Sequence, residues 1–448
     1  PGTATEPHLL RPHENNYLAA VARQDKRAGI AYVDVSTGEF RATEIEHADA
    51  AALLETLNVR EVLLPPGADP FPGVRTELDA WVFSFDYADR TLREHFKLHS
   101  LDGCGLTDRP LATAAAGAVL HYLRDTQRSA LGHLDRPVWF DRAGAMLLDA
   151  VTVRNLELVE PLFAGEGKEV TLLHVLDQTL TGMGGRLLRN RLLRPALARA
   201  EIEARLDAVE EMLAGPILRA EARKVLADVL DLERLLAKVT LGTANPRELL
   251  ALARSLGRVP DLKALIRDSG AGRLREIHAR LDEVAEARDR ILAALADEPP
   301  VNLADGGVIR DGFNSELDQL RDIRRNSKQY IARIEARERE RTGIQSLKVR
   351  FNNVFGYFIE ISKANLHLAP DDYDRKQTLV NAERFTTPEL KELEAKILDA
   401  EEKILAVERE IFGQLRAAAA AEAARIRQTA AAVAELDVTA ALAQAAAE

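Results

Sequence analysis

The sequence predicts a multidomain, mainly α-helical protein, in which an N-terminal α/β domain precedes a helical region and a long antiparallel helical arm with a small β tip. The chain has 448 residues, enough for two to four domains of about 150 residues each. Aromatic residues are only 5% of it, while Leu, Ala, Glu and Arg, which favour helices, are frequent. Strand-like runs are concentrated in the first 110 or so positions and again near position 350.

Residues 1–112 are predicted to form the α/β domain. Short apolar or β-branched runs alternate here with stretches of helical composition, and a loop rich in Pro and Gly interrupts them at 65–73. The expected strands cover 17–22, 30–35, 40–45, 61–64 and 81–85, and the expected helices cover 48–57 and 87–98.

Residues 113–312 are predicted to be helical. A helix rich in Ala and Leu is expected at 111–131. From 171 to about 296, sharp Gly and Pro breakers separate helices of ordinary length. The apolar alternation at 146–158 fits either a strand or a helix.

Residues 313–398 are predicted to form the arm. Apolar positions between Phe313 and Ile334 keep helical spacing, so we expect one helix at 313–341. A second helix should begin at Thr387-Pro388-Glu389, because Thr is a good N-cap, Pro suits the first helical position and Glu complements the helix dipole. Its apolar residues follow a near-heptad pattern, which favours antiparallel pairing with the first helix. Residues 399–448 then return to the helical region.

Between the two arm helices the period changes to that of a β-strand. The apolar residues at 347, 349 and 351 fall on one face of this predicted strand, and Lys348, Arg350 and Asn352 fall on the other. A turn at 353–356 and a second strand at 357–362 would complete the tip.

The arm is basic although the whole chain is acidic. The chain holds 60 Lys and Arg against 71 Asp and Glu, for a formal net charge of −11, whereas positions 321–350 hold ten basic and four acidic residues. Binding to the phosphates of duplex DNA needs Lys and Arg together with small polar donors. The candidate DNA-binding residues are Lys348, Arg350, Asn352, Asn353, Ser362, Lys363 and Asn365. They form no obvious base-reading array, so contact independent of sequence is expected.

A second interpretation stays open for the helix charges. The alternating Arg and Glu residues of 337–341 would also be typical of a solvated helix face whose side chains form surface ion pairs.

Other motifs give weaker indications of chemistry. The glycines at 165–169 and 181–186 lack phosphate-loop spacing and fit a helix start or a close contact between helices better. His95, His99 and Cys104 have only loosely metal-like spacing. A metal-dependent nuclease would need several carboxylates, and only Asp34 and Asp86 are candidates at strand ends. We therefore predict no catalytic residue and no metal site.

The single cysteine excludes an internal disulfide framework and fits a reducing cytosol. No apolar run approaches the roughly 18 residues of a membrane span, so no membrane partner is expected. The chain begins Pro1-Gly2-Thr3, without an initiator Met or a signal-peptide pattern, and we expect it to be a piece of a longer protein.

Five segments of the arm are specific enough to be recognised together: RERERTGI at 337–344, SLKV at 346–349, FGYFIEI at 355–361, RKQTL at 375–379 and NAERF at 381–385. They resemble the clamp of the MutS family of DNA mismatch-repair proteins. Segments NNYLAA at 15–20 and DVSTGEF at 34–40 resemble the connector of that family, and RNLEL at 154–158 and GGRLLR at 184–189 resemble its lever core. The resemblance covers essentially the whole chain in the family's order.

The resemblance implies an architecture. Residues 1–112 would be a connector with a ribonuclease-H-like fold that lacks the catalytic acids. Residues 113–312 and 399–448 would be the two parts of the core or lever domain, and 313–398 the clamp inserted in it. The family's mismatch-reading domain and its ATPase domain, which binds ATP and Mg, match no part of the chain. The fragment is therefore expected to need no cofactor and to hydrolyse no ATP.

The resemblance also implies a mechanism and partners. Two subunits of the family's full-length protein embrace duplex DNA, their clamps touch its backbone, and the lever helices transmit the nucleotide state of the ATPase. The implied partners are double-stranded DNA, a second subunit and MutL, which the connector helps to bind. The expected location is the bacterial cytoplasm, at the nucleoid. The competing hypothesis is a helical structural or adaptor protein that docks other proteins without contacting DNA.

Overall fold

The computed structural model describes residues 1–69, 71, 73–127, 131–140, 144–146, 148–163, 165–352 and 356–448, apart from the side chains of Pro7, Ile323, Arg324, Ser327, Lys328 and Lys396. The chain divides into two compact units. Unit 1 comprises Pro1–Leu292 and Leu415–Glu448, and unit 2 comprises Ala293–Gln414. Each unit has a sheet and a hydrophobic core of its own.

The sheet of unit 1 is mixed, with the strand order β5-β4-β1-β2-β3-β6. β1, β2 and β3 form an antiparallel meander, β4 lies parallel to β1, β5 parallel to β4, and β6 parallel to β3. The strands are β1 (Leu18–Gln24), β2 (Arg27–Val33), β3 (Phe40–Glu46), β4 (Glu61–Leu64), β5 (Val74–Glu77) and β6 (Val138–Trp139). The expected α/β region at the N-terminus is confirmed.

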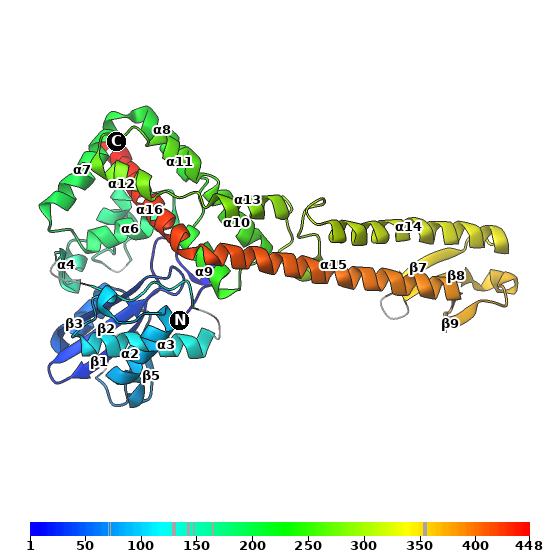
Figure 1. Cartoon of the computed structure of the whole chain (residues 1–448), viewed down its shortest axis with the longest axis horizontal. Coiled ribbons are helices and arrows are strands. Elements are labelled where there is room, and N and C mark those ends of the chain that lie inside the picture. Colours follow the sequence, from blue (N-terminus) through cyan, green and yellow to red (C-terminus); the bar gives the residue numbers. More distant parts are fainter. Residues whose placement is uncertain are drawn as a thin grey trace. The chain divides into compact units, whose positions relative to one another are not determined.

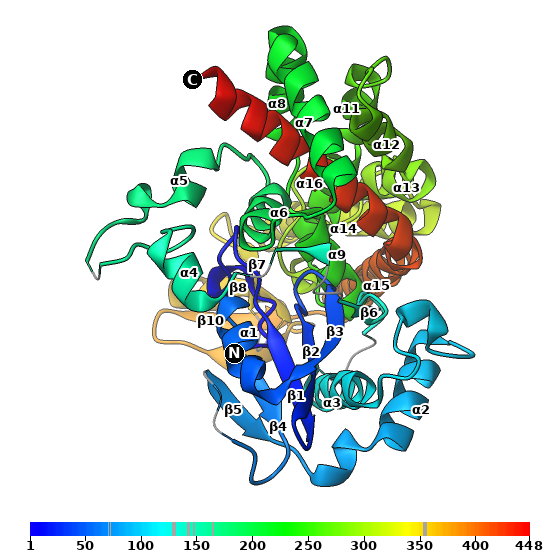
Figure 2. The same cartoon turned by 90° about the vertical axis from the view of Figure 1, so that its left-hand side faces the viewer.

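Both faces of this sheet are buried. Along β1, Leu18 and Ala20 contribute to one hydrophobic core and Ala19 and Val21 to the other, as the alternation of side chains requires. Helix α3 packs against strands β1, β2 and β3, and Figure 2 shows it beside the sheet. The covering helices are α1 (Ala50–Thr56), α2 (Phe85–Phe96) and α3 (Pro110–Gln127).

Helix α3 approaches the sheet closely at Gly29 of β2, where a Cβ atom would overlap the backbone of Leu111. Glu44 of β3 fixes the start of the helix, because its Oε1 accepts hydrogen bonds from the backbone N–H groups of Leu111 (2.9 Å) and Ala112 (3.0 Å). The predicted domain boundary at residue 112 thus falls inside a helix that packs on the sheet and on α2 (Phe85–Phe96).

One local prediction differs from the structure, and strand β5 lies where no strand was predicted. Residues 81–85 do not form a strand: a 3₁₀ helix, η3 (Ala80–Phe83), leads into α2. Only Val82 of this run is buried, and the exposed Trp81 packs edge-on against Tyr87 with ring centroids 4.9 Å apart. Strand β5 was not predicted, because Val74 is its only apolar residue and lies exposed.

The ambiguous stretch at 146–158 contains a short helix, α4 (Ala150–Asn155). Asp149 caps it by accepting a hydrogen bond from the backbone N–H of Thr152 at 2.6 Å. This local cap decides between the two interpretations that the apolar alternation left open.

The remaining helices of unit 1 pack around α16 (Ala423–Ala447), which contacts α5 to α9 and α12. By length and composition α16 could cross a membrane, but 67% of its apolar window is buried inside the unit, as in the core helix of a globular domain. The helices between the two parts of the unit are α5 (Leu172–Leu176), α6 (Gly182–Leu193), α7 (Arg199–Ala214), α8 (Pro216–Leu226), α9 (Leu232–Leu241), α10 (Pro246–Leu256), α11 (Val259–Leu265), α12 (Gly272–Arg280) and α13 (Ala285–Ala294).

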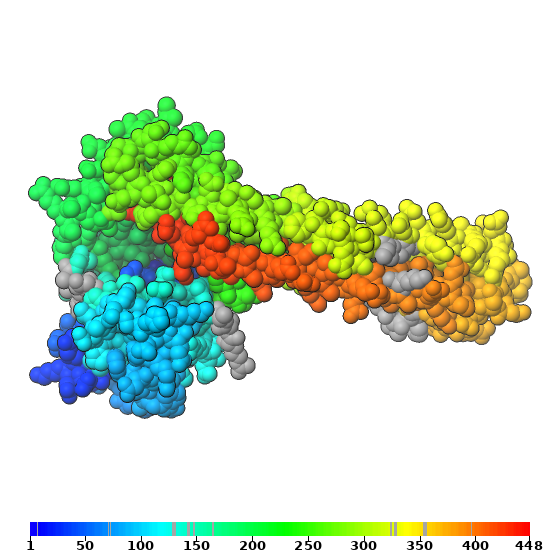
Figure 3. Space-filling view, in the orientation of Figure 1, coloured from blue at the N-terminus to red at the C-terminus, as the bar shows by residue number. Residues whose placement is uncertain are grey.

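Unit 2 is built on two long helices, α14 (Ser315–Thr342) and α15 (Pro388–Ala421), the second of which continues past Gln414 into unit 1. They run antiparallel, because Arg321 early in α14 pairs with Glu408 late in α15, and Arg337 late in α14 pairs with Glu389 at the start of α15. Figures 1 and 3 show the two helices side by side. The predicted N-cap is confirmed: Thr387 Oγ1 accepts a hydrogen bond from the backbone N–H of Leu390 at 3.2 Å.

The sheet of unit 2 lies between these helices in the sequence and is entirely antiparallel, with the order β7-β8-β10-β9. Its strands are β7 (Lys348–Asn352), β8 (Gly356–Ser362), β9 (Asp374–Thr378) and β10 (Ala382–Thr386). The sequence predicted the first two strands and missed the other two. The fold class, a mainly helical chain with an N-terminal α/β region and a later sheet between long helices, is confirmed.

Candidate nucleic-acid interface

The sheet of unit 2 has a mainly apolar inner face and an outer face that carries charged residues beside the buried Phe358. The inner face packs against Ile334 of α14 and Leu390 of α15 through the sheet residues Val349, Tyr357, Ile359, Ile361 and Phe385. Residues between these alternate to the other side. The cross-strand pairs on that outer face are Lys348 with Glu360, Arg350 with Phe358, and Glu360 with Arg384.

The structure brings part of the predicted site together on this outer face. Lys348 and Arg350 are exposed on β7, and Asn352 is half-buried on the same strand and face. Ser362, also half-buried, ends β8 on that face. The geometric prediction that Lys348 and Arg350 share an exposed face is therefore confirmed.

The other predicted residues lie elsewhere. Lys363 is exposed and Asn365 half-buried in the 3₁₀ helix η8 (Lys363–Leu368), which follows the sheet. Asn365 Nδ2 donates a hydrogen bond to Ser346 Oγ at 3.1 Å, so its amide is used locally. Asn353 lies outside the described residues.

Sequence reasoning missed Arg384 of β10, which the sheet places beside the predicted residues. Its guanidinium lies 4.2 Å above the ring of Phe358, and its Nη1 donates a hydrogen bond to Gln377 Oε1 at 2.8 Å. No period-2 pattern in AERFT at 382–386 marks this strand, and only its pairing with β8 places Arg384 on the outer face.

The charged run of 337–341 has a structural role. Glu338 is buried, and its Oε2 accepts a hydrogen bond from the Tyr373 hydroxyl at 2.8 Å. Burial, followed by this bond, raises the pKa of Tyr373 above its ordinary value. Arg337 pairs with Glu338 and Glu389, and Arg341 pairs with Glu338 and Asp372.

The same helix also closes the free edge of the sheet. Glu335 Oε2 accepts a hydrogen bond from the backbone N–H of Val349 at 2.8 Å, and Arg339 Nε donates to the carbonyl of Leu347 at 2.7 Å. Arg339 and Glu335 form an ion pair with each other at 2.6 Å. These ion pairs favour the interpretation of the helix charges as intramolecular partners.

The basic character of the tip depends on how its charged residues are distributed between the faces of the sheet. Positions 343–386 hold six basic and five acidic residues, so the segment as a whole is nearly neutral. On the described outer face of β7, β8 and β10, however, the cations are Lys348, Arg350 and Arg384, and the acid is Glu360. That face therefore carries an excess of positive charge that suits a polyanion.

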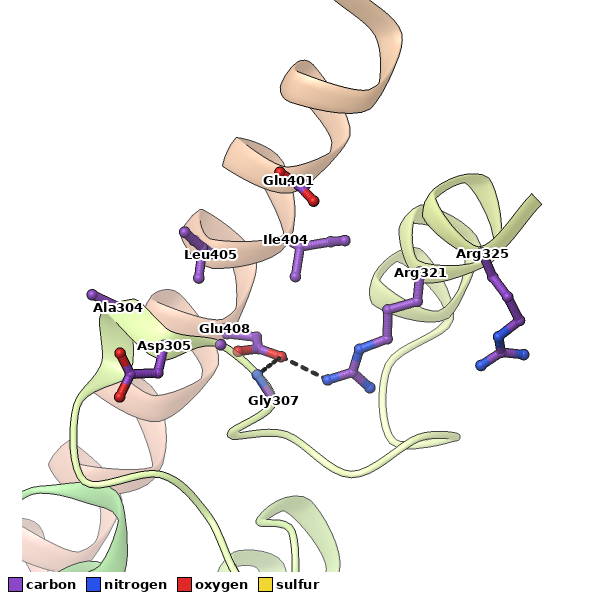
Figure 4. A pocket seen from close by; sticks show the side chains of 10 residues that line it. Ala304, Asp305, Gly307, Arg321, Arg325, Glu401, Ile404, Leu405 and Glu408 are labelled. Atoms are coloured by element: carbon purple, nitrogen blue, oxygen red, sulfur yellow. Dashed lines mark hydrogen bonds and ion pairs between the residues drawn. The ribbon is translucent and has the colours of Figure 1, made fainter. Parts of the chain in front are cut away.

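Unit 2 also contains a cavity of about 440 Å³ beside α14 and α15 (Figure 4). Glu408, fully buried, joins three elements there: Oε1 accepts hydrogen bonds from Arg321 Nη2 (2.6 Å) and the Gly307 N–H (3.2 Å), and Oε2 accepts from the Val308 N–H (3.3 Å). The cavity is lined by Ala304, Asp305, Gly306, Gly307, Arg321, Arg325, Glu401, Ile404, Leu405 and Glu408. The Glu408 carboxylate thus links α15 to α14 through Arg321 and to the segment at 307–308.

The motifs considered for other chemistry have structural roles where they are described. Asp34 is fully buried and accepts hydrogen bonds from Asn15 Nδ2 (2.9 Å), the Asn16 N–H (3.1 Å) and the Ser36 hydroxyl (2.7 Å). Burial raises the pKa of the Cys104 thiol and lowers that of His95. Among the described residues, no group of three or more His, Cys, Asp and Glu is placed to hold a metal ion.

The glycines at 181–186 open α6, as the sequence indicated. Thr181 caps this helix by accepting a hydrogen bond from the Gly184 N–H at 3.0 Å. A Cβ at Gly184 would overlap the carboxylate of Asp437 on α16, so glycine allows the two helices to approach closely.

Comparison with known proteins agrees with this architecture. The family model described as MutS domain II matches residues 16–135, and the one described as MutS domain III matches residues 151–443. The chain belongs to the MutS family. Its relatives include proteins called DNA mismatch repair protein MutS from Solibacter usitatus (64% identity, covering 100% of this chain and 53% of that protein) and Symbiobacterium thermophilum (47% identity, 99% and 52%).

The MutS-family chain spans about half the length of the curated relatives it matches. The sheet of unit 2, with the outer face described above, lies within the part matched by domain III. The α/β sheet of unit 1 lies within the part matched by domain II, except for β6, which begins after it.

Proposed function

We propose that this chain acts in DNA mismatch repair as the part that grips duplex DNA without reading its sequence. The observation that carries the proposal is the sorting of charge on the sheet of unit 2, where Lys348 and Arg350 are exposed and share one face with Arg384. The assignment to mismatch repair comes from the relatives, which are called DNA mismatch repair protein MutS.

The chemistry of this face fits the DNA backbone better than the bases. Lys and Arg neutralise phosphates whatever the sequence, and this supplies most of the affinity of non-specific binding. Sequence readout needs a helix or ribbon that places bidentate groups at base edges in a groove. The outer face belongs to a sheet of short strands, and Arg384 is already engaged with Gln377 and Phe358.

The long helices suit the transmission of a conformational signal. The Arg321–Glu408 pair fixes α14 to α15, and α15 continues from unit 2 into unit 1 without a break. A helix of 34 residues is about 51 Å long, and its backbone hydrogen bonds make it stiff. In the proposal these helices act as levers that couple DNA binding by unit 2 to the nucleotide state of the ATPase domain.

The remaining parts of the proposal concern the whole protein. ATP and Mg would be bound outside these 448 residues, and the chain itself would hydrolyse no ATP. Self-association would allow two subunits to surround the duplex. The connector would contribute to binding MutL. The protein would work in the bacterial cytoplasm, at the nucleoid.

The decisive experiment compares duplex binding by the chain and by its Lys348→Glu/Arg350→Glu variant, using fluorescence anisotropy over a range of salt. Reversing two phosphate-binding charges should abolish detectable binding at about 200 mM salt and lower the slope of log K against log salt by about 2. Unchanged affinity and slope would favour the adaptor hypothesis. Lys403→Glu, an exposed change on α15 away from the sheet, is the control.

A further inference from the structure

An acidic residue stands in the middle of the basic outer face. Glu360 of β8 is the cross-strand partner of Lys348 on one side and of Arg384 on the other. Its Oε1 lies 3.6 Å from Arg350 Nη1, and its Oε2 lies 3.5 Å from Arg384 Nε. One carboxylate thus pairs with both arginines of the proposed DNA-binding face and is the cross-strand neighbour of its lysine, Lys348.

Glu360 remains accessible to whatever binds there. Its side chain is 23% exposed, against 53% for Arg350 and 19% for Arg384. A DNA phosphate that approached either guanidinium would come within a few ångströms of this carboxylate, where two negative charges repel each other even close to solvent.

We infer that Glu360 competes with DNA phosphates for Arg350 and Arg384, and so limits the strength of the grip. It also positions both guanidinium groups on the sheet before DNA arrives, in the case of Arg384 together with Gln377 and Phe358. The inference rests on the proposed function. A grip held weak by its own carboxylate would let the protein release and move along a duplex.

A purely structural role for Glu360 predicts the opposite effect. If the carboxylate served only to hold the sheet together, removing its charge would loosen the two arginines and weaken binding. Competition with phosphate predicts stronger binding, because one more cation becomes free to neutralise a phosphate and release a counterion. The salt dependence of binding therefore separates the two roles.

The test is Glu360→Gln, which keeps the size of the side chain and an oxygen that accepts hydrogen bonds. We expect duplex affinity to rise about five- to tenfold at about 50 mM salt, and the slope of log K against log salt to steepen by about 0.9. Glu402→Gln, at an exposed position on α15, makes the same change in net charge away from the sheet and should alter neither quantity.

A double-mutant cycle makes the test specific. If Glu360 acts through Arg350, the gain from Glu360→Gln should shrink at least twofold when Arg350→Gln is also present. Weaker binding, an unchanged slope, or an equal gain from Glu402→Gln would each overturn the inference while leaving the proposed function intact. No duplex binding by the unchanged chain would refute the proposed function itself.

Discussion

Replacing Glu338 by Ala tests whether the charged run on α14 stabilises the tip. Glu338 is 3% exposed and receives a hydrogen bond from the Tyr373 hydroxyl at 2.8 Å, with Arg337 Nε and Arg341 Nε each 3.3 Å from its oxygens. A hydrogen bond to a charged group contributes about 1.5–3 kcal/mol. The two arginines are 55% and 43% exposed, so water screens them and their contribution is small.

The expected loss in the free energy of local unfolding is therefore about 2–3 kcal/mol. Native-state hydrogen exchange of amides in β8 and β10 measures it, because these amides exchange when the tip opens. They should exchange roughly 30- to 150-fold faster in Glu338→Ala. Glu340→Ala, an exposed neighbour in the same run, should change exchange less than threefold. Unchanged exchange combined with lost DNA binding would refute the structural role and make the run a DNA contact.

Two further predictions concern buried polar groups. Burial lowers the pKa of His133 to about 4, below its ordinary value of 6.5, so the folded state favours the neutral imidazole. The free energy of unfolding should therefore be highest above pH 6.5 and should fall by about 3 kcal/mol as the pH drops to 4, because the unfolded chain then binds a proton that the folded chain does not. Urea unfolding followed by tryptophan fluorescence should show this loss, and His133→Gln should remove it. Glu408→Ala should cost about 3–5 kcal/mol, because it leaves Arg321 and two backbone N–H groups without their buried acceptor. Limited proteolysis at 303–312 should accelerate strongly in this variant and not in Glu410→Ala, and equal rates would contradict the role of Glu408.

Sequence periodicity was sufficient for the long elements of the chain. The apolar spacing of α14 and the cap at Thr387 are local signals, and they predicted the bounds of α14 and the start of α15 to within a few residues. Strands β9 and β10 were missed because the segments DRKQT and AERFT contain few apolar residues. Their sheet positions depend on pairing with β8, which is a tertiary feature.

The candidate site was predictable to the same degree. Alternation alone placed Lys348 and Arg350 on one exposed face. Arg384 and Glu360 could not be assigned to that face without the register of β8 and β10. The helix charges looked like an excess of positive charge because several of their acidic partners, among them Glu389 and Asp372, lie outside the segment that was counted.

The most direct test of the account is a lysine footprint of the chain with and without a short DNA duplex. An amine-reactive ester labels exposed lysines, and mass spectrometry quantifies the label at each position. We predict strong protection of Lys348 by the duplex at low salt, with Lys403, which is 59% exposed on α15, labelled equally in both states. Full labelling of Lys348 under conditions where the duplex is bound would contradict the account.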